Sequence, residues 1–258
     1  MGTIGYSVRD GIAEISMSRP PVNALDQEML VDLLAALRRA EDDRDTRAVI
    51  LHSAIAGRFC AGLDLKLAST ASAEQLYDVT RKLYIELFDV QFNLGKPSIS
   101  VVTGAARGGG MTVAVSSDMI VAAESATFGY PEIDNGLLPA IHYVHLPRVV
   151  GRQRAFDLLF TGRTFSATEA FGLGLINRVV PDDDVLDCAR ALARILASKP
   201  PEAVRRGRAA FMSALDQNYR RDIATAVENF CNVANRKEAR ERLLAFAGRH
   251  KTDMAPGR

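Results

Sequence analysis

The pattern of apolar and polar positions predicts a β-hairpin at the N-terminus. Residues 4–8 alternate between apolar and less apolar positions, and residues 13–17 do so again after the turn-forming pair at 10–11. Two period-two runs joined by a tight turn are typical of a hairpin. Beyond a proline break at residues 19–21 the apolar positions recur with helical spacing, and Asp26 is placed to cap that helix. A helix with one apolar face is therefore expected next.

Strands and helices then alternate, and helices alone follow. Short apolar runs predict strands at 47–51, 99–102, 119–122 and 176–180, of which 99–102 is expected to be buried. A long helix is expected over about 73–94, and a capping box at Ser166 to Glu169 starts another. From residue 184 the pattern is helical almost to the end. We therefore predict an α/β core over 1–198 and a helical C-terminal region over 199–258, separated at a Lys-Pro-Pro break.

Composition narrows the class of protein. The chain has 258 residues, of which 48% are hydrophobic and 24% charged. These values exclude a collagen-like, a disordered and a disulfide-scaffold protein. The 32 Lys and Arg against 31 Asp and Glu leave a net charge of +1. Such a balance provides no general field for nucleic acid or for an anionic membrane, so we expect neither as a partner.

The cysteines, the histidines and the apolar runs indicate where the protein is located and whether it binds a metal. The three cysteines, Cys60, Cys188 and Cys231, are far apart in the sequence. An odd count without a pair indicates a reducing compartment. No zinc-ligand spacing is present, so no metal is expected. Acidic residues interrupt the N-terminal segment that a targeting signal would need, and no apolar run reaches the ~18 residues of a membrane span. We therefore expect a cytoplasmic protein.

Three segments carry residues suited to chemistry. Residues 59–66 (FCAGLDLK) follow a predicted strand, residues 104–110 (GAARGGG) precede a helix, and residues 128–132 (FGYPE) lie in a turn-rich stretch. Glycines allow close approach of a ligand to the backbone, and free N–H groups at a helix start favour negative charge. The triple glycine thus indicates an anion or oxyanion site, or else tight packing of helix on strand. It matches neither the P-loop nor the dinucleotide-binding fingerprint.

Taken together, these segments resemble the crotonase (enoyl-CoA hydratase/isomerase) superfamily over nearly the whole chain. The matching motifs, in order, are RPPVNAL at 19–25, FCAGLDL at 59–65, GxxxGGG at 104–110, ATFGYPEI at 126–133, LPRVVG at 146–151, TGR at 161–163 and AxEAxGLxLINRVV at 167–180. The resemblance implies a spiral of ββα turns with a helical C-terminal trimerisation region, assembled as a homotrimer or a dimer of trimers. It also implies an acyl-CoA thioester as substrate, with coenzyme A as part of that substrate and no other cofactor.

The resemblance assigns roles residue by residue. The backbone N–H groups of Leu63 and Gly109 would stabilise a thioester enolate, which develops charge only during the reaction. Contacts to CoA are implied for the first loop (residues 59–66) and for a C-terminal pair of one aromatic and one basic residue, which reaches CoA from a neighbouring subunit. These expected CoA-binding residues are Ala61, Asp64, Leu65, Lys66, Phe246 and Arg249.

The chain departs from the hydratase pattern at two places. Hydratases of the family use two glutamates; here one position is Glu132 and the other is Thr112, whose neutral hydroxyl is a poor base. Thr112 is either a residue that holds water or substrate, or a packing residue. Asp134 is a secondary carboxylate candidate. After Pro139 a glycine-rich stretch is replaced by bulkier residues, and polar contacts to the acyl group or buried packing are both open for His142, Tyr143 and His145.

The favoured function is an acyl-CoA enzyme that stabilises a thioester enolate and uses Glu132 alone for isomerase-like proton transfer. A carboxyl beside a thioester pocket, with its pKa raised by burial, suits that role. The alternatives are an atypical hydratase, a decarboxylase, a hydrolase or a lyase of an acyl-CoA. From a different class, a non-catalytic CoA- or RNA-binding scaffold remains open.

Overall fold

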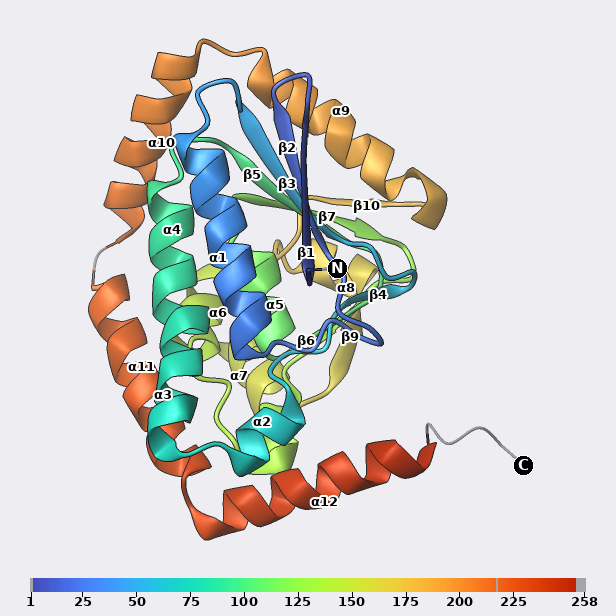
Figure 1. Ribbon diagram of the computed structural model, residues 1–258, viewed down its shortest axis with the longest axis vertical. Helices are drawn as coiled ribbons and strands as arrows, with labels where there is room; N and C mark the ends of the chain where they lie inside the picture. The colour runs from blue at the N-terminus through green and yellow to red at the C-terminus, as the bar shows by residue number, and fades with distance from the viewer. Residues whose placement is uncertain (1, 217, 254–258) are drawn as a thin grey trace.

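A computed structural model describes residues 2–216 and 218–253, which form two sheets surrounded by helices (Figure 1). The larger sheet has the order β1 (Ile4–Arg9), β2 (Ile12–Met17), β3 (Ala48–Ser53), β5 (Ser98–Val102), β7 (Met119–Ala123) and β10 (Arg178–Val180). β1 and β2 pair antiparallel, and the other neighbours are parallel. The antiparallel pairing of β1 with β2 confirms the predicted hairpin. Its turn residues Asp10 and Gly11 both have positive φ, as a two-residue type I′ turn requires.

The smaller sheet is formed by four short strands that the sequence pattern does not predict, three of them at segments expected to be loops or turns. Its order is β4 (Arg58–Cys60), β6 (Ala105–Arg107), β8 (Thr127–Gly129) and β9 (Thr164–Ser166). Strands of three residues are too short to show a period-two pattern, so no sequence pattern indicates them. Each buried strand β3, β5 and β7 is followed by one of these short strands and then by a helical turn. This repetition confirms the expected spiral of ββα turns.

The helices of the core follow the predicted apolar faces. α1 (Gln27–Asp42) begins where Asp26 accepts a hydrogen bond from the N–H of Met29 at 2.9 Å. The helix predicted over 73–94 is divided into α3 (Ala73–Arg81), the π-helical turn η1 (Lys82–Glu86) and α4 (Leu87–Asn93). π-Helical turns inside α-helices occur frequently at functional sites. The sequence pattern did not distinguish this wider turn, because apolar residues continue along one face through it.

Helices of the spiral and of the connecting segments complete the core. They are α2 (Leu65–Thr70), α5 (Gly109–Val115), the 3-10 turn η2 (Pro131–Asn135), α6 (His142–Val150), α7 (Arg152–Thr161), α8 (Ala167–Gly172) and the 3-10 turn η3 (Asp182–Asp184). The predicted capping box before α8 is half formed. Ser166 accepts a hydrogen bond from the Glu169 N–H at 3.1 Å, but the Glu169 carboxylate pairs with Arg163 instead of returning to the cap.

The C-terminal helices wrap the core. α9 (Val185–Ala197) packs on the larger sheet, and α10 (Pro201–Leu215) is anchored by Arg208, whose buried guanidinium pairs with Asp118. α11 (Tyr219–Ala234) follows, and α12 (Lys237–Asp253) lies across α2 and η2, along the lower edge of Figure 1. The 198/199 domain boundary and the trimerisation role of this region stay predictions.

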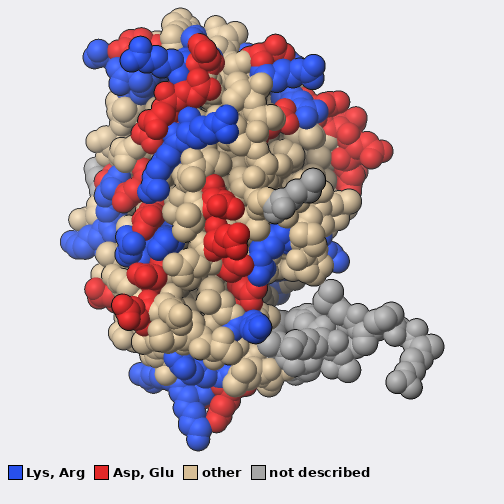
Figure 2. Space-filling view, viewed as in Figure 1, with Lys and Arg blue, Asp and Glu red and all other residues tan. Residues whose placement is uncertain are grey.

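The described surface carries mixed charge. Basic and acidic side chains interleave over the face drawn in Figure 2. Within residues 2–216 and 218–253, no helix is both long and apolar enough to cross a membrane, and no group of three His, Cys, Asp or Glu side chains is placed to hold a metal ion.

Candidate active site

In the first loop, residues 59–66, the backbone N–H of Leu63 points away from the neighbouring segment at Leu25. Leu25 and Leu63 form a parallel bridge in which the Leu25 N–H donates to the Gly62 carbonyl at 2.7 Å and the Asp64 N–H donates to the Leu25 carbonyl at 2.8 Å. Peptide groups alternate in direction along an extended segment, so the N–H of Leu63 points to the opposite side. Gly62 has φ +91° and lies so close to the second loop that a Cβ there would be 2.6 Å from the Arg107 carbonyl.

The second loop, residues 104–110, brings another backbone N–H donor to the same place. α5 begins at Gly109, whose N–H therefore has no carbonyl partner in its own helix. The nitrogen of Leu63 lies 3.3 Å from the position that a Cβ on Gly109 would occupy. Across the described parts of the chain, neither N–H group donates to a backbone acceptor. Two preorganised donors on one small volume can stabilise an oxyanion as its charge develops.

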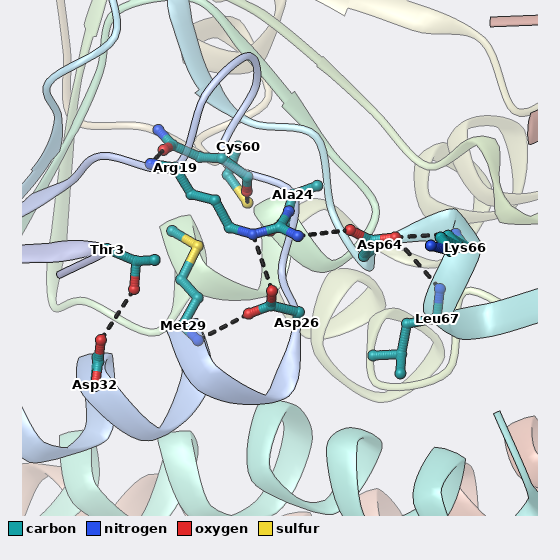
Figure 3. A network of polar contacts seen from close by, with 11 residues as sticks. Thr3, Arg19, Ala24, Asp26, Met29, Asp32, Cys60, Asp64, Lys66 and Leu67 are labelled. Carbon is teal, nitrogen blue, oxygen red and sulfur yellow. Dashed lines mark hydrogen bonds and ion pairs between the residues drawn. The ribbon is translucent and has the colours of Figure 1, made fainter. Parts of the chain in front are cut away.

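Arg19 holds the first loop in place. Its guanidinium pairs with Asp64 and Asp26 at 2.9 Å each and donates to the Ala24 carbonyl at 2.9 Å (Figure 3). Asp64 in turn caps α2 by accepting from the Lys66 N–H at 2.9 Å. The carboxylate that the sequence predicted to contact CoA is thus engaged in fixing the loop. Sequence reasoning did not identify Arg19 as a site residue, although it lies in a matched motif.

Glu132 places a buried carboxyl group beside the two N–H donors. It lies on η2 and is only 8% exposed, and its Oε2 atom has no hydrogen-bond partner among the described residues. Burial raises its pKa from 4.5 to about 8. Glu132, Leu63 and Gly109 line one cavity of about 60 Å³. Gly108, with φ +50°, lies directly against this carboxyl group. A Cβ at Gly108 would be only 2.8 Å from Glu132 Oε1, so a larger residue there would displace the Glu132 side chain.

Thr112 does not line this cavity. Its Oγ1 atom is buried on α5 and lies 3.2 Å from Nε2 of His142, the first residue of α6. The same Nε2 atom is 3.4 Å from the Gly108 carbonyl oxygen. Burial lowers the pKa of His142 to about 3, so the ring is neutral at physiological pH. The position of the second hydratase glutamate is therefore occupied by a hydroxyl directed at a neutral histidine.

The other predicted residues are divided between the cavity and the surface. Ala61 and Leu65 line the cavity, whereas Lys66 is exposed at the start of α2. Asp134 is exposed and lies against Gly162, outside the set of residues that line the cavity. Phe246 and Arg249 lie in α12 at positions whose side chains are outside the described residues.

Tyr143 and His145, the other two polar residues after Pro139, contact aromatic side chains of α7 and α11. The ring of Tyr143 lies 5.6 Å from that of Phe160, and the Tyr219 hydroxyl is 3.3 Å from Nδ1 of His145. His145 and Tyr219 belong to the wall of a second cavity of about 380 Å³ between η1, α4, α6, α10 and α11. Sites for small molecules usually have volumes of ~300–1,000 Å³.

Tyr84 separates the two cavities, and no sequence pattern indicated it. It is a buried residue of the π-helical turn η1 and lines both the Glu132 cavity and the larger one. Its neighbour Leu83 lines the larger cavity and packs against Gly109, since a Cβ on that glycine would lie 2.9 Å from Leu83 Cδ2. This turn of helix is thus a wall between the two volumes.

Known proteins show the same fold and related sequences. The family model described as enoyl-CoA hydratase/isomerase matches residues 7–255. Enoyl-CoA hydratase domain-containing protein 2, mitochondrial, from Homo sapiens is 37% identical over 92% of this chain and 82% of that protein. The crystal structure of an enoyl-CoA hydratase/isomerase from Xanthobacter autotrophicus Py2 matches with a TM-score of 0.86 and 28% identity, covering 98% of this chain and 99% of that chain. An enoyl-CoA hydratase from Bacillus halodurans, at 22% identity and a TM-score of 0.88 over 95% of this chain and all of that one, shows the shared fold. With a family model spanning almost every residue, the chain belongs to the enoyl-CoA hydratase/isomerase family.

Proposed function

We propose that this protein moves a proton between carbons of an acyl-CoA thioester, in the manner of an enoyl-CoA isomerase, with Glu132 as the single acid-base group. The observation that carries the proposal is the content of one small cavity. Two free N–H groups and one buried, unpartnered carboxyl group meet there, and Glu132 is the acidic residue among the described residues that line it.

The geometry suits enolate chemistry. With the thioester oxygen on the N–H groups of Leu63 and Gly109, negative charge that forms on that oxygen is stabilised where it develops. The carboxylate of Glu132 removes a proton from the α carbon of a 3-enoyl thioester, and the electrons delocalise onto the thioester oxygen. The protonated Glu132 then returns a proton to the γ carbon, which gives the 2-enoyl thioester. One base that shuttles one proton suffices for this sequence.

Hydration is the second candidate, because relatives of this chain carry enoyl-CoA hydratase in their names. Adding water across a double bond requires that water be held and deprotonated while a proton is delivered to carbon. Thr112 is directed at His142 and lies outside the Glu132 cavity, and its hydroxyl is neutral at ordinary pH. The arrangement therefore favours isomerisation over hydration.

Further expectations accompany this proposal. CoA would bind beside the first loop, near Ala61 and Leu65, with no cofactor other than the CoA of the substrate. A homotrimer or a dimer of trimers is the expected assembly. The cytoplasmic location also remains a prediction, and the human relative is named as mitochondrial.

The experiment incubates a 2-enoyl-CoA and a 3-enoyl-CoA separately with the protein in heavy water and follows the products by mass spectrometry. Deuterium at carbon without added water supports proton shuttling. A product heavier by one water identifies a hydratase and contradicts the proposal. Glu132→Gln is expected to lower the rate by about 10²–10⁴-fold, the usual contribution of a general acid-base group. The matched control is Glu228→Gln, which makes the same replacement at an exposed position of α11.

A further inference from the structure

We propose that His142 is a positioning residue for the oxyanion site: its Nε2–H holds the Gly108–Gly109 peptide so that the Gly109 N–H points into the Glu132 cavity. The inference rests on the proposed function, because it assumes that the Gly109 N–H serves a thioester enolate. His142 does not belong to the residues that line that cavity, so it acts through the peptide and not on the substrate.

The contacts of His142 define the direction of its hydrogen bond. Nε2 lies 3.4 Å from the Gly108 carbonyl oxygen and 3.2 Å from Thr112 Oγ1. A carbonyl oxygen only accepts, so Nε2 carries the hydrogen and donates, and Thr112 Oγ1 accepts from the same N–H. Nδ1 then has no hydrogen, in agreement with its lack of a partner among the described residues. The imidazole at the start of α6 is thus hydrogen-bonded to the first turn of α5 at two points, the Gly108 carbonyl before it and the Thr112 hydroxyl at its end.

The contact acts on the catalytic donor because both belong to one peptide group. The carbonyl of Gly108 and the N–H of Gly109 lie in a single planar unit and point in opposite directions. Holding the carbonyl therefore fixes where the N–H points. A hydrogen bond to the carbonyl also polarises the amide and strengthens its N–H as a donor. His142 adds a side-chain donor to the N–H groups of Met111 and Thr112, which reach the same carbonyl at 2.9 and 3.2 Å.

The local backbone explains why such a support is needed. Gly108 adopts φ +50° and is followed by two more glycines, the residue type with the greatest conformational freedom. His142 itself is fully buried, and its ring lies 4.5 Å from that of Tyr130. A buried imidazole therefore holds one end of a segment of three consecutive glycines, the residue type with the widest choice of backbone conformations.

The test compares binding of an enolate with binding of a neutral thioester. Acetoacetyl-CoA forms an enolate that absorbs in the near ultraviolet, whereas butanoyl-CoA stays neutral and its binding is followed by calorimetry. For His142→Leu we expect enolate binding to weaken about 10-fold or more, butanoyl-CoA binding to change less than about 2-fold, and kcat to fall while KM stays nearly constant. His142→Gln, whose amide nitrogen can take the place of Nε2, is expected to recover enolate binding to within about 3-fold of the unaltered protein. The matched control is His52→Leu, which makes the same replacement on β3 at a histidine that lines neither cavity, and it is expected to change the binding of neither ligand.

Each outcome decides the matter. Equal losses for both thioesters, or equal enolate binding in His142→Leu and the unaltered protein, would overturn the positioning role while leaving the proposed function intact. If the unaltered protein binds acetoacetyl-CoA without forming the enolate, both proposals fail. Should His142→Leu not fold, the pair His142→Gln and His142→Asn replaces it, because the shorter asparagine does not place a donor at the Nε2 position. Identical enolate binding in that pair would likewise overturn the inference.

Discussion

Replacing Glu132 by glutamine should change how stability depends on pH, because the buried carboxyl group titrates at different pH values in the folded and unfolded chain. Its pKa is about 8 in the folded protein against an ordinary 4.5. Between these values the folded state holds a proton that the unfolded state has lost. Stability therefore falls as pH rises through this window, by ~1.4 kcal/mol per pH unit. Relative to pH below 4.5, the whole interval corresponds to about 5 kcal/mol.

Glu132→Gln removes this titration without changing the size of the side chain. The variant should therefore gain stability relative to the unaltered protein as pH rises, by about 4 kcal/mol between pH 5 and pH 9. The assay is urea-induced unfolding of both proteins at a series of pH values and one fixed protomer concentration, since any assembly makes apparent stability concentration-dependent.

The control for this experiment is Glu228→Gln, at an exposed position, whose stability curve should run parallel to that of the unaltered protein. A difference between Glu132→Gln and the unaltered protein that stays constant within about 1 kcal/mol from pH 5 to pH 9 would refute the reasoning. Glu132 would then be ionised in the folded protein over most of that range, and burial would not raise its pKa to about 8.

Three further outcomes are expected. As a base, Glu132 must start deprotonated, so kcat/KM for a 3-enoyl-CoA should rise with pH to a plateau above about pH 8; a flat profile in steady-state assays would argue against this base. Arg19→Leu should reduce kcat/KM by about 10-fold or more, since the loop that carries the Leu63 N–H loses its clamp; an unchanged rate would assign Arg19 to stability alone. Tyr84→Ala should raise the ratio of kcat/KM for long over short acyl-CoA thioesters, because removing the ring that lines both cavities would let a long acyl chain extend from one into the other. An unaltered ratio would mean that the cavities stay separate.

Local patterns in the sequence predicted the elements and the chemistry-bearing segments. The hairpin, the Asp26 cap and the buried strands depend on neighbouring residues, so period and turn chemistry were sufficient to predict them. The same holds for Glu132 as the carboxyl candidate, which a short motif identified. What a local pattern could not show was the second sheet, because its strands of three residues have no readable period.

The tertiary structure alone decided how the site is built. Arg19 and Asp64 are 45 positions apart in the chain, and Thr112 and His142 are 30 apart, yet each pair is in contact. Only the folded chain brings the Leu63 and Gly109 N–H groups together, and only burial raises the pKa of Glu132. The sequence by itself determined which groups are available and which elements carry them. Their pairing, orientation and proton affinity depend on distances and exclusion of water, which exist only once the spiral has closed.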